Sequence, residues 1–130
     1  ERVSARMPAL HLTSAADTAF ERTYVERATP AFLDRLRQRP DDVDAMNAFA
    51  YLMLAQQRPE DALVLYEEVV RRVPGDPRVW ERIATCQQLL GRPAQERAAL
   101  EQALALTNAS VDGVRAARIG ARLQSLAGAR

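Results

Sequence analysis

The sequence predicts an all-α fold made of stacked helical hairpins, and three observations carry this prediction. The first is a repeat with a period of 34 residues in the middle of the chain. The features that recur in steps of 34 are Arg58-Pro59 and Arg92-Pro93, and the series Pro40, Pro74 and Asn108. The second is the helical spacing of apolar residues in most segments. The third is the lack of sustained apolar–polar alternation, which strands would show. A long period kept through unrelated residue types is typical of repeat arrays.

Composition limits the function classes. The chain has 130 residues, about one domain's worth. All of its basic residues are arginines, 18 against 17 acidic residues, which leaves a net charge of +1. This balance gives no general attraction to nucleic acid or to anionic membranes. No apolar run approaches the ~18 residues of a membrane span, so we expect no membrane insertion by this fragment.

The ends of the chain show weaker patterns. Residues 1–12 have no clear period and are interpreted as an N-terminal arm or linker, with a short apolar run from Met7 to Leu12. Residues 13–130 are expected to form a single domain. The sequence begins at Glu1 without a start methionine, so we expect a fragment of a longer chain. Arginine without lysine is typical of a GC-rich genome and indicates a bacterial source, and residues 1–12 contain no signal-peptide pattern. The compartment stays open between cytoplasm and periplasm.

Seven helices are expected from their start and stop signals. The first begins after Ser14, and Thr29-Pro30 predicts the start of a second, with threonine as N-cap and proline at the first helical position. The remaining predicted signals are Asp41 or Asp42 as the cap of the third helix, Pro59 for the fourth, Asp76-Pro77 for the fifth, Pro93 for the sixth and Ser110 as the cap of the seventh.

The repeat resembles the tetratricopeptide repeat family when Val43 is the first position of the unit. The matching residues are Met46, Phe49, Ala50, Met53, Ala62, Tyr66, Val69 and Pro74, then Trp80, Ile83, Ala84, Leu100 and Ala103. The resemblance implies a right-handed α-α superhelix. Its repeats would be about 43–76 and 77–110, with a degenerate hairpin at about 9–42 and a capping helix at about 111–127.

Two residues depart from the family pattern. Glu96 stands at the twentieth position, where alanine is expected, and Gln87 at the eleventh, where a large apolar residue is expected. The second hairpin should therefore be looser, or Glu96 should point outward after a small shift of helix phase.

The resemblance also implies a concave groove lined by the first helix of each hairpin. The groove positions hold Asp44, Asn47, Tyr51, Leu54, Ala55, Arg78, Glu81, Arg82, Thr85, Gln88 and Leu89, and the last helix would add Arg115, Ile119 and Arg122. Arg78 and Arg82 are suited to a carboxylate or an acidic segment, with Asn47 and Tyr51 as hydrogen-bonding anchors. The alternative is an ordinary solvated helix face whose arginines pair with Glu81. The family's clamp for a C-terminal carboxylate is only half present, which argues against that ligand.

Other constellations favour structural interpretations. Arg115, Arg118, Arg122 and Arg130 form a basic stripe that fits phosphates or acidic lipids, but the solvated face of an end helix is the favoured interpretation. His11 and Cys86 are single and far apart, so no metal site, catalytic residue or cofactor is expected.

The sequence therefore predicts a non-enzymatic scaffold or adaptor that binds a peptide or helix of a partner protein in its groove. One alternative is a self-assembly module that forms homo-oligomers. Another is a regulatory or docking domain of a larger bacterial secretion, envelope or enzyme complex.

Overall fold

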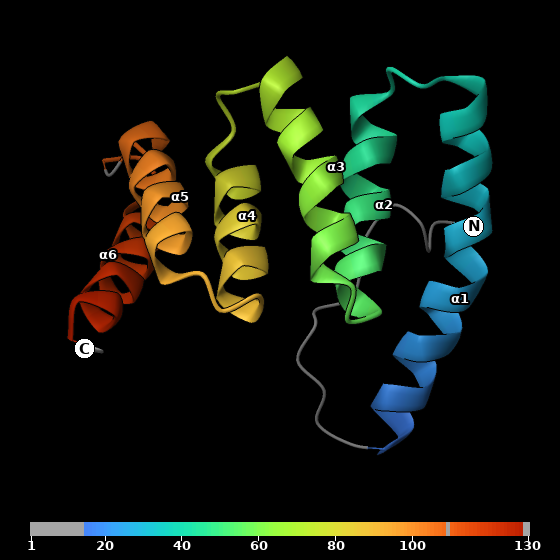
Figure 1. Cartoon of the computed structure of the whole chain (residues 1–130), viewed down its shortest axis with the longest axis horizontal. Helices are drawn as coiled ribbons and strands as arrows, with labels where there is room; N and C mark the ends of the chain where they lie inside the picture. The colour runs from blue at the N-terminus through green and yellow to red at the C-terminus, as the bar shows by residue number, and fades with distance from the viewer. Residues whose placement is uncertain (1–14, 109, 129–130) are drawn as a thin grey trace.

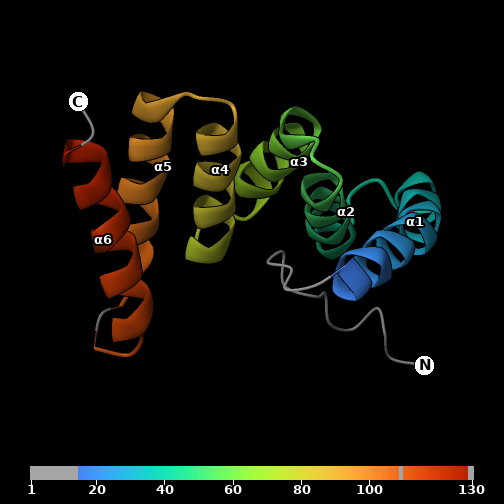
Figure 2. The same cartoon turned by 90° about the horizontal axis from the view of Figure 1, so that it is seen from below.

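A computed structural model describes residues 15–108 and 110–128, and within them the side chains of Tyr24 and of residues 26 onward. These residues form six helices and no strand (Figure 1). The helices are α1 (Ala15–Gln38), α2 (Val43–Ala55), α3 (Pro59–Arg72), α4 (Pro77–Leu89), α5 (Pro93–Leu106) and α6 (Gly113–Gly128). They follow one another in chain order as an arc, with α3 on its outer side (Figure 2). The predicted all-α solenoid is confirmed.

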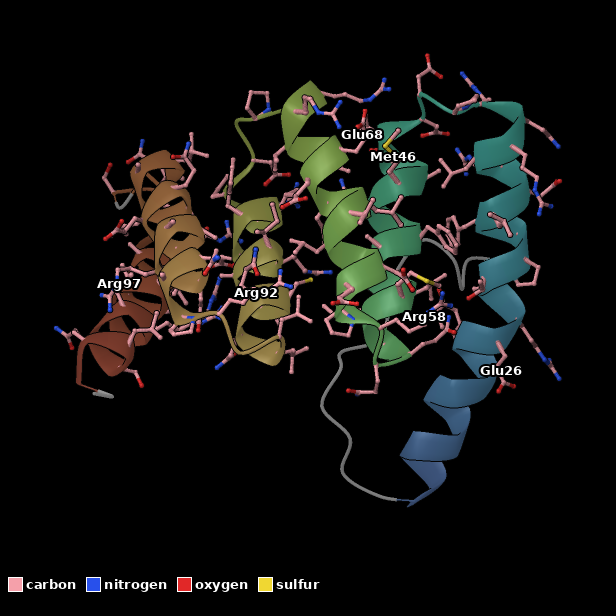
Figure 3. The ribbon with its side chains drawn as sticks, in the orientation of Figure 1. Glu26, Met46, Arg58, Glu68, Arg92 and Arg97 are labelled. Carbon is pink, nitrogen blue, oxygen red and sulfur yellow. The ribbon has the colours of Figure 1, made fainter. Side chains whose placement is uncertain are left out.

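The 34-residue period of the sequence returns in the helix bounds. Each bound of α2 and α3 is followed, 34 residues later, by the matching bound of α4 and α5. The turns inside the two hairpins also match, since Gln57 and Gly91 have φ values of 63° and 71°. In both turns the next residue's N–H donates to the helix carbonyl five residues back, at 3.0 Å for Arg58 and 2.9 Å for Arg92. Figure 3 shows these two arginines at the same edge of the array. The repeat is therefore structural as well as sequential.

The caps explain where the repeated helices begin. Asp42 Oδ1 accepts the backbone N–H of Ala45 at 3.1 Å, and Asp76 Oδ1 accepts that of Arg78 at 3.0 Å. Each aspartate thus satisfies an N–H that the helix itself leaves free. Pro59 and Pro93 open α3 and α5, where a missing N–H costs nothing.

One continuous core joins α2 to α6. Residues at equivalent positions of the two repeats fill it, such as Ala50 and Ala84, both fully buried. Small residues there let the helices of a hairpin approach, and large ones such as Tyr66 and Leu100 fill the space between. Met46 is buried and Trp80 partly buried against the same core, at the fourth position of α2 and α4. Trp80 Nε1 also donates to the Pro74 carbonyl at 3.0 Å.

The prediction of two helices before Pro40 is wrong, because this segment forms the single helix α1. Pro30 lies inside α1, and Thr29 does not start a new helix. Instead, Thr29 Oγ1 accepts a hydrogen bond from Gln56 Nε2 at 3.1 Å, across to the end of α2. Ala28 and Phe32, on either side of the proline, both pack against the cluster formed by Tyr24 and Leu52 of α2. Continuous packing on both sides of Pro30 offsets the backbone hydrogen bond that proline removes.

The predicted start of the last helix is also wrong. Ser110 was expected to cap it, but α6 begins at Gly113. Asp112 Oδ1 accepts the N–H of Arg115 at 3.0 Å, so Asp112 is the cap. Ser110 instead bonds Asn108 Oδ1 through its own N–H and hydroxyl, at 3.1 and 2.6 Å.

Several predictions fall outside the described residues: the arm 1–12 with its Met7–Leu12 run, His11 and Arg130. In the part of the chain that is described, no helix combines the length and the apolar character needed to cross a membrane.

Candidate protein-binding surface

The residues predicted to line a groove come from α2, α4 and α6, and the structure divides them by burial. Tyr51, Leu54 and Ile119 have exposed fractions of only 8%, 3% and 0%, so a partner has little of them to touch. The predicted residues that stay half-buried or exposed are Asp44, Asn47, Ala55, Arg78, Glu81, Arg82, Thr85, Gln88, Leu89, Arg115 and Arg122. We call this second set the inner face.

Arg78 is already occupied within its own helix start. Its Nε lies 3.0 Å from Asp76 Oδ1 and its Nη2 lies 2.8 Å from Asp76 Oδ2, a bidentate pair. The pair lowers the pKa of Asp76 and raises that of Arg78. One edge of the Arg78 guanidinium is therefore occupied and its charge is offset by Asp76, which weakens its attraction for a second carboxylate.

The arginines of α6 point back onto the second hairpin. Arg118 Nη2 reaches both carboxylate oxygens of Glu81 at 2.9 Å. Arg115 Nε is 3.8 Å from Glu81 Oε1, and Arg115 Nη1 is 2.9 Å from Asp112 Oδ2. Arg122 Nη2 lies 3.5 Å from Glu96 Oε2. The basic stripe therefore neutralises acids of α4 and α5, and this agrees with a structural role for an end helix.

Glu96 corrects an expectation from the repeat pattern. It neither points outward nor loosens its hairpin, because only 5% of it is exposed and α4 and α5 pack at least as closely as α2 and α3. Its carboxylate lies under α6, where Arg122 supplies the countercharge. Gln87, the other departure, is also buried, and its Oε1 accepts from Arg92 Nη1 at 3.5 Å.

Arg82 stands at the centre of the inner face, between the two hairpins. Its guanidinium carbon lies 4.5 Å from the ring centroid of Tyr51, a cation–π distance. Its Nη1 lies 3.4 Å from the hydroxyl oxygen of Tyr66. Burial raises the pKa of Tyr66 to about 12, so this hydroxyl is neutral at ordinary pH. Side chains from α2, α3 and α4 thus hold one exposed arginine in a defined position.

The remaining inner-face residues on α4 are uncharged: Thr85 and Gln88 are polar, and Leu89 is an exposed apolar residue. Thr85 Oγ1 donates to the Glu81 carbonyl at 3.2 Å, and Gln88 is exposed three residues further along the same side. Asn47 is half-buried on α2. Sequence reasoning had not assigned Arg118 to any partner, and it had not joined Tyr66 to Arg82, because both contacts cross between helices.

Other residues with reactive side chains lie away from the inner face. Cys86 is fully buried, and burial raises the pKa of its thiol to about 11. Within the described part of the chain, no group of three or more His, Cys, Asp or Glu side chains is placed to hold a metal ion. A polar depression of about 390 Å³ lies at the α1–α2 turn, lined by Arg35, Arg39, Asp41, Asp42, Val43 and Asp44.

Comparison with known proteins agrees with this architecture. The model of the tetratricopeptide repeat family matches residues 43–86. No curated protein sequence matches significantly.

Solved structures of similar fold include two of PcrH and one of SycD. PcrH from Pseudomonas aeruginosa has a TM-score of 0.73 at 19% identity, over 92% of this chain and 98% of that one. PcrH in complex with the chaperone-binding region of PopD gives 0.73 at 21% identity, over 83% and 82%. SycD, a type III secretion translocator chaperone of Yersinia enterocolitica, gives 0.75 at 18%, over 82% and 74%. At these identities the likeness establishes the fold. Residues 43–86 thus match the tetratricopeptide-repeat family, and the chain has the all-α fold of PcrH and SycD.

Proposed function

We propose that this chain is a non-enzymatic scaffold or adaptor that holds a segment of a partner protein, a peptide or a helix, against its inner face. The observation that carries the proposal is the position of Arg82, an exposed cation held by Tyr51 and Tyr66 where the two hairpins meet. Fixing an exposed arginine costs side-chain entropy and adds little apolar burial to the core, but it reduces the entropy lost when a partner binds.

The comparisons support the same kind of function. PcrH, which has this fold, is known in complex with a segment of another protein, the chaperone-binding region of PopD. An array of helical hairpins presents a long surface made of one side of several helices, which suits an extended or helical segment.

Site-specific photo-crosslinking tests the proposal. A photoreactive amino acid at Gln88, exposed on α4, should form a covalent adduct with the partner in the source cell. The matched control is the same probe at Glu101, exposed on α5, which carries no inner-face residue. Mass spectrometry then identifies the adducts. Equal adducts from both positions, or none from Gln88, would remove the inner face from the account.

Self-assembly is a second candidate, favoured by a separate observation. Val111 and Val114, at the start of α6, have exposed fractions of 81% and 77%. A second copy packed there would bury apolar surface that now faces water. Sedimentation velocity of the protein and of a Val111→Ser, Val114→Ser variant tests this. A monomer at micromolar concentration in both would end the idea.

A further inference from the structure

The arginines on the inner face and on α6 differ in one respect. Four of them lie within 4 Å of a carboxylate: Arg78, Arg115, Arg118 and Arg122. Arg82 has no carboxylate partner among the described side chains; its contacts there are with the Tyr51 ring and the Tyr66 hydroxyl. Glu81, the acid next to it in sequence, is bound to Arg118.

The geometry leaves part of the Arg82 guanidinium available. One face lies against the Tyr51 ring, and Nη1 lies next to the Tyr66 hydroxyl. A guanidinium carries five N–H donors, so Nε and Nη2 keep donors that no described side chain uses. Arg82 is more than a third exposed, and these donors are therefore accessible from solvent. Two N–H groups on one edge match the two oxygens of a carboxylate.

We propose that Arg82 is the position on the inner face that selects an acidic side chain, aspartate or glutamate, in the bound segment. This rests on the proposed function and specifies the chemistry of its partner. Arg78 is engaged with Asp76, so a second free cation is missing and the site suits one carboxylate. Thr85 and Gln88 continue along the same side of α4 and offer neutral hydrogen-bonding groups to flanking residues.

Preorganisation strengthens this site relative to a free surface arginine. Tyr51 comes from α2, Tyr66 from α3 and Arg82 from α4, so the orientation of the guanidinium is set by folding. Less side-chain freedom remains to be lost when a carboxylate binds. Removal of the tyrosine contacts should therefore weaken binding even though the charge is kept.

Peptide selection tests the proposal. A phage library of random 12-residue peptides is panned on the immobilised protein, on Arg82→Gln and on the matched control Arg97→Gln. Arg97 lies on the far side of α5, at the end of the array (Figure 3). Peptides selected by the protein and by Arg97→Gln should be enriched in aspartate or glutamate at one position, and those selected by Arg82→Gln should not.

Affinity measurement makes the test quantitative. Exchange of the enriched acid for its amide in a selected peptide should weaken binding by ~10-fold, as expected for a charge-assisted hydrogen bond. The same exchange should change binding to Arg82→Gln by less than about twofold, and Arg82→Lys should fall between the two. Thermal unfolding verifies that each variant is folded.

The possible failures are distinguishable. Enriched peptides without acidic preference, or with the same preference for Arg82→Gln, would overturn the role of Arg82 and leave the proposed function standing. If no peptide is enriched on any variant, while each is folded, the proposed function falls and this inference falls with it.

Discussion

The ion pair of Glu96 and Arg122 predicts that removing one partner destabilises the protein more than removing the other. The side chain of Glu96 is 6% exposed and that of Arg122 is 27% exposed, with 3.5 Å between Oε2 and Nη2. Removal of Arg122 leaves a carboxylate under α6 without a countercharge. Removal of Glu96 leaves an arginine that can turn toward water. The two single substitutions should therefore differ in cost, although they break the same contact.

The magnitudes follow from the burial of the partner left behind. Breaking a fully buried ion pair costs ~3–5 kcal/mol. Arg122 is partly exposed and its distance is long, so we expect about 2–3 kcal/mol for Arg122→Met. Glu96→Met should cost about 1 kcal/mol or less, and the double substitution should lie within about 1 kcal/mol of the original protein. For a chain of this size, the loss in Arg122→Met corresponds to a fall in Tm of roughly 10 °C.

Urea unfolding at pH 7 measures these free energies. Far-ultraviolet circular dichroism follows all the helices, and the fluorescence of Trp80 follows α4. Coincident transitions are needed first, because repeat arrays can unfold in parts. Equal losses for the two single substitutions, or a larger loss for Glu96→Met, would refute the reasoning from burial.

Three further predictions follow from local geometry. Gln57 has a φ of 63°, and Gln57→Gly should raise the free energy of unfolding by about 0.5–1 kcal/mol, whereas Gly91→Ala, its equivalent, should lower it by about 1 kcal/mol in the same urea assay. Asp112→Ala should cost about 1 kcal/mol because α6 loses its cap, and Ser110→Ala should cost less; equal losses would argue against Asp112 as the cap. Cys86 has its thiol pKa raised to about 11, so stability should be constant up to about pH 9 and then fall by roughly 2 kcal/mol as the pH rises to 11. In Cys86→Ala the part of the fall that begins near pH 9 should be absent, and the falls that Tyr66 and Tyr24 cause above about pH 10, where an unfolded tyrosine ionises, should remain.

The repeated hairpins could be predicted from the sequence because local signals fix them. Asp42 and Asp76 cap the N-termini of α2 and α4, and a proline begins the second helix of each hairpin. Gly91, in the left-handed region, follows the end of α4. Each signal acts within a few residues and does not depend on the rest of the fold. The bounds of α2 to α5 followed from the period for the same reason.

The error at α1 has the opposite cause. Thr29-Pro30 is a good helix start by local rules, and nothing nearby in sequence contradicts that interpretation. The outcome depends on residues of α2 more than twenty positions away: Leu52, whose cluster Ala28 and Phe32 pack against, and Gln56, which bonds Thr29. Tertiary packing overrides the local signal, and a single sequence does not show that packing.

In the candidate site, too, the local features were predictable from the sequence and the long-range contacts were not. The period predicted which residues lie on the first helices of the hairpins, and most of them are accessible. It did not predict the partners of the arginines, since Arg118 and Glu81 are 37 positions apart and Arg82 and Tyr66 are 16 apart. The availability of a charge depends on such distant pairs. The free arginine of the inner face therefore became visible only in three dimensions.

The departure of Glu96 from the repeat pattern is explained by its position next to the end helix α6. In the first repeat the twentieth position is Ala62, fully buried where α3 meets its neighbours. In the second repeat the hairpin meets α6, which brings Arg122 to a carboxylate that an apolar neighbour would leave uncompensated. The buried acid thus depends on the arginine at this boundary, whereas the partly exposed arginine depends much less on the acid. Glu96 therefore fits a neighbouring helix that brings an arginine to this contact, as α6 does through Arg122.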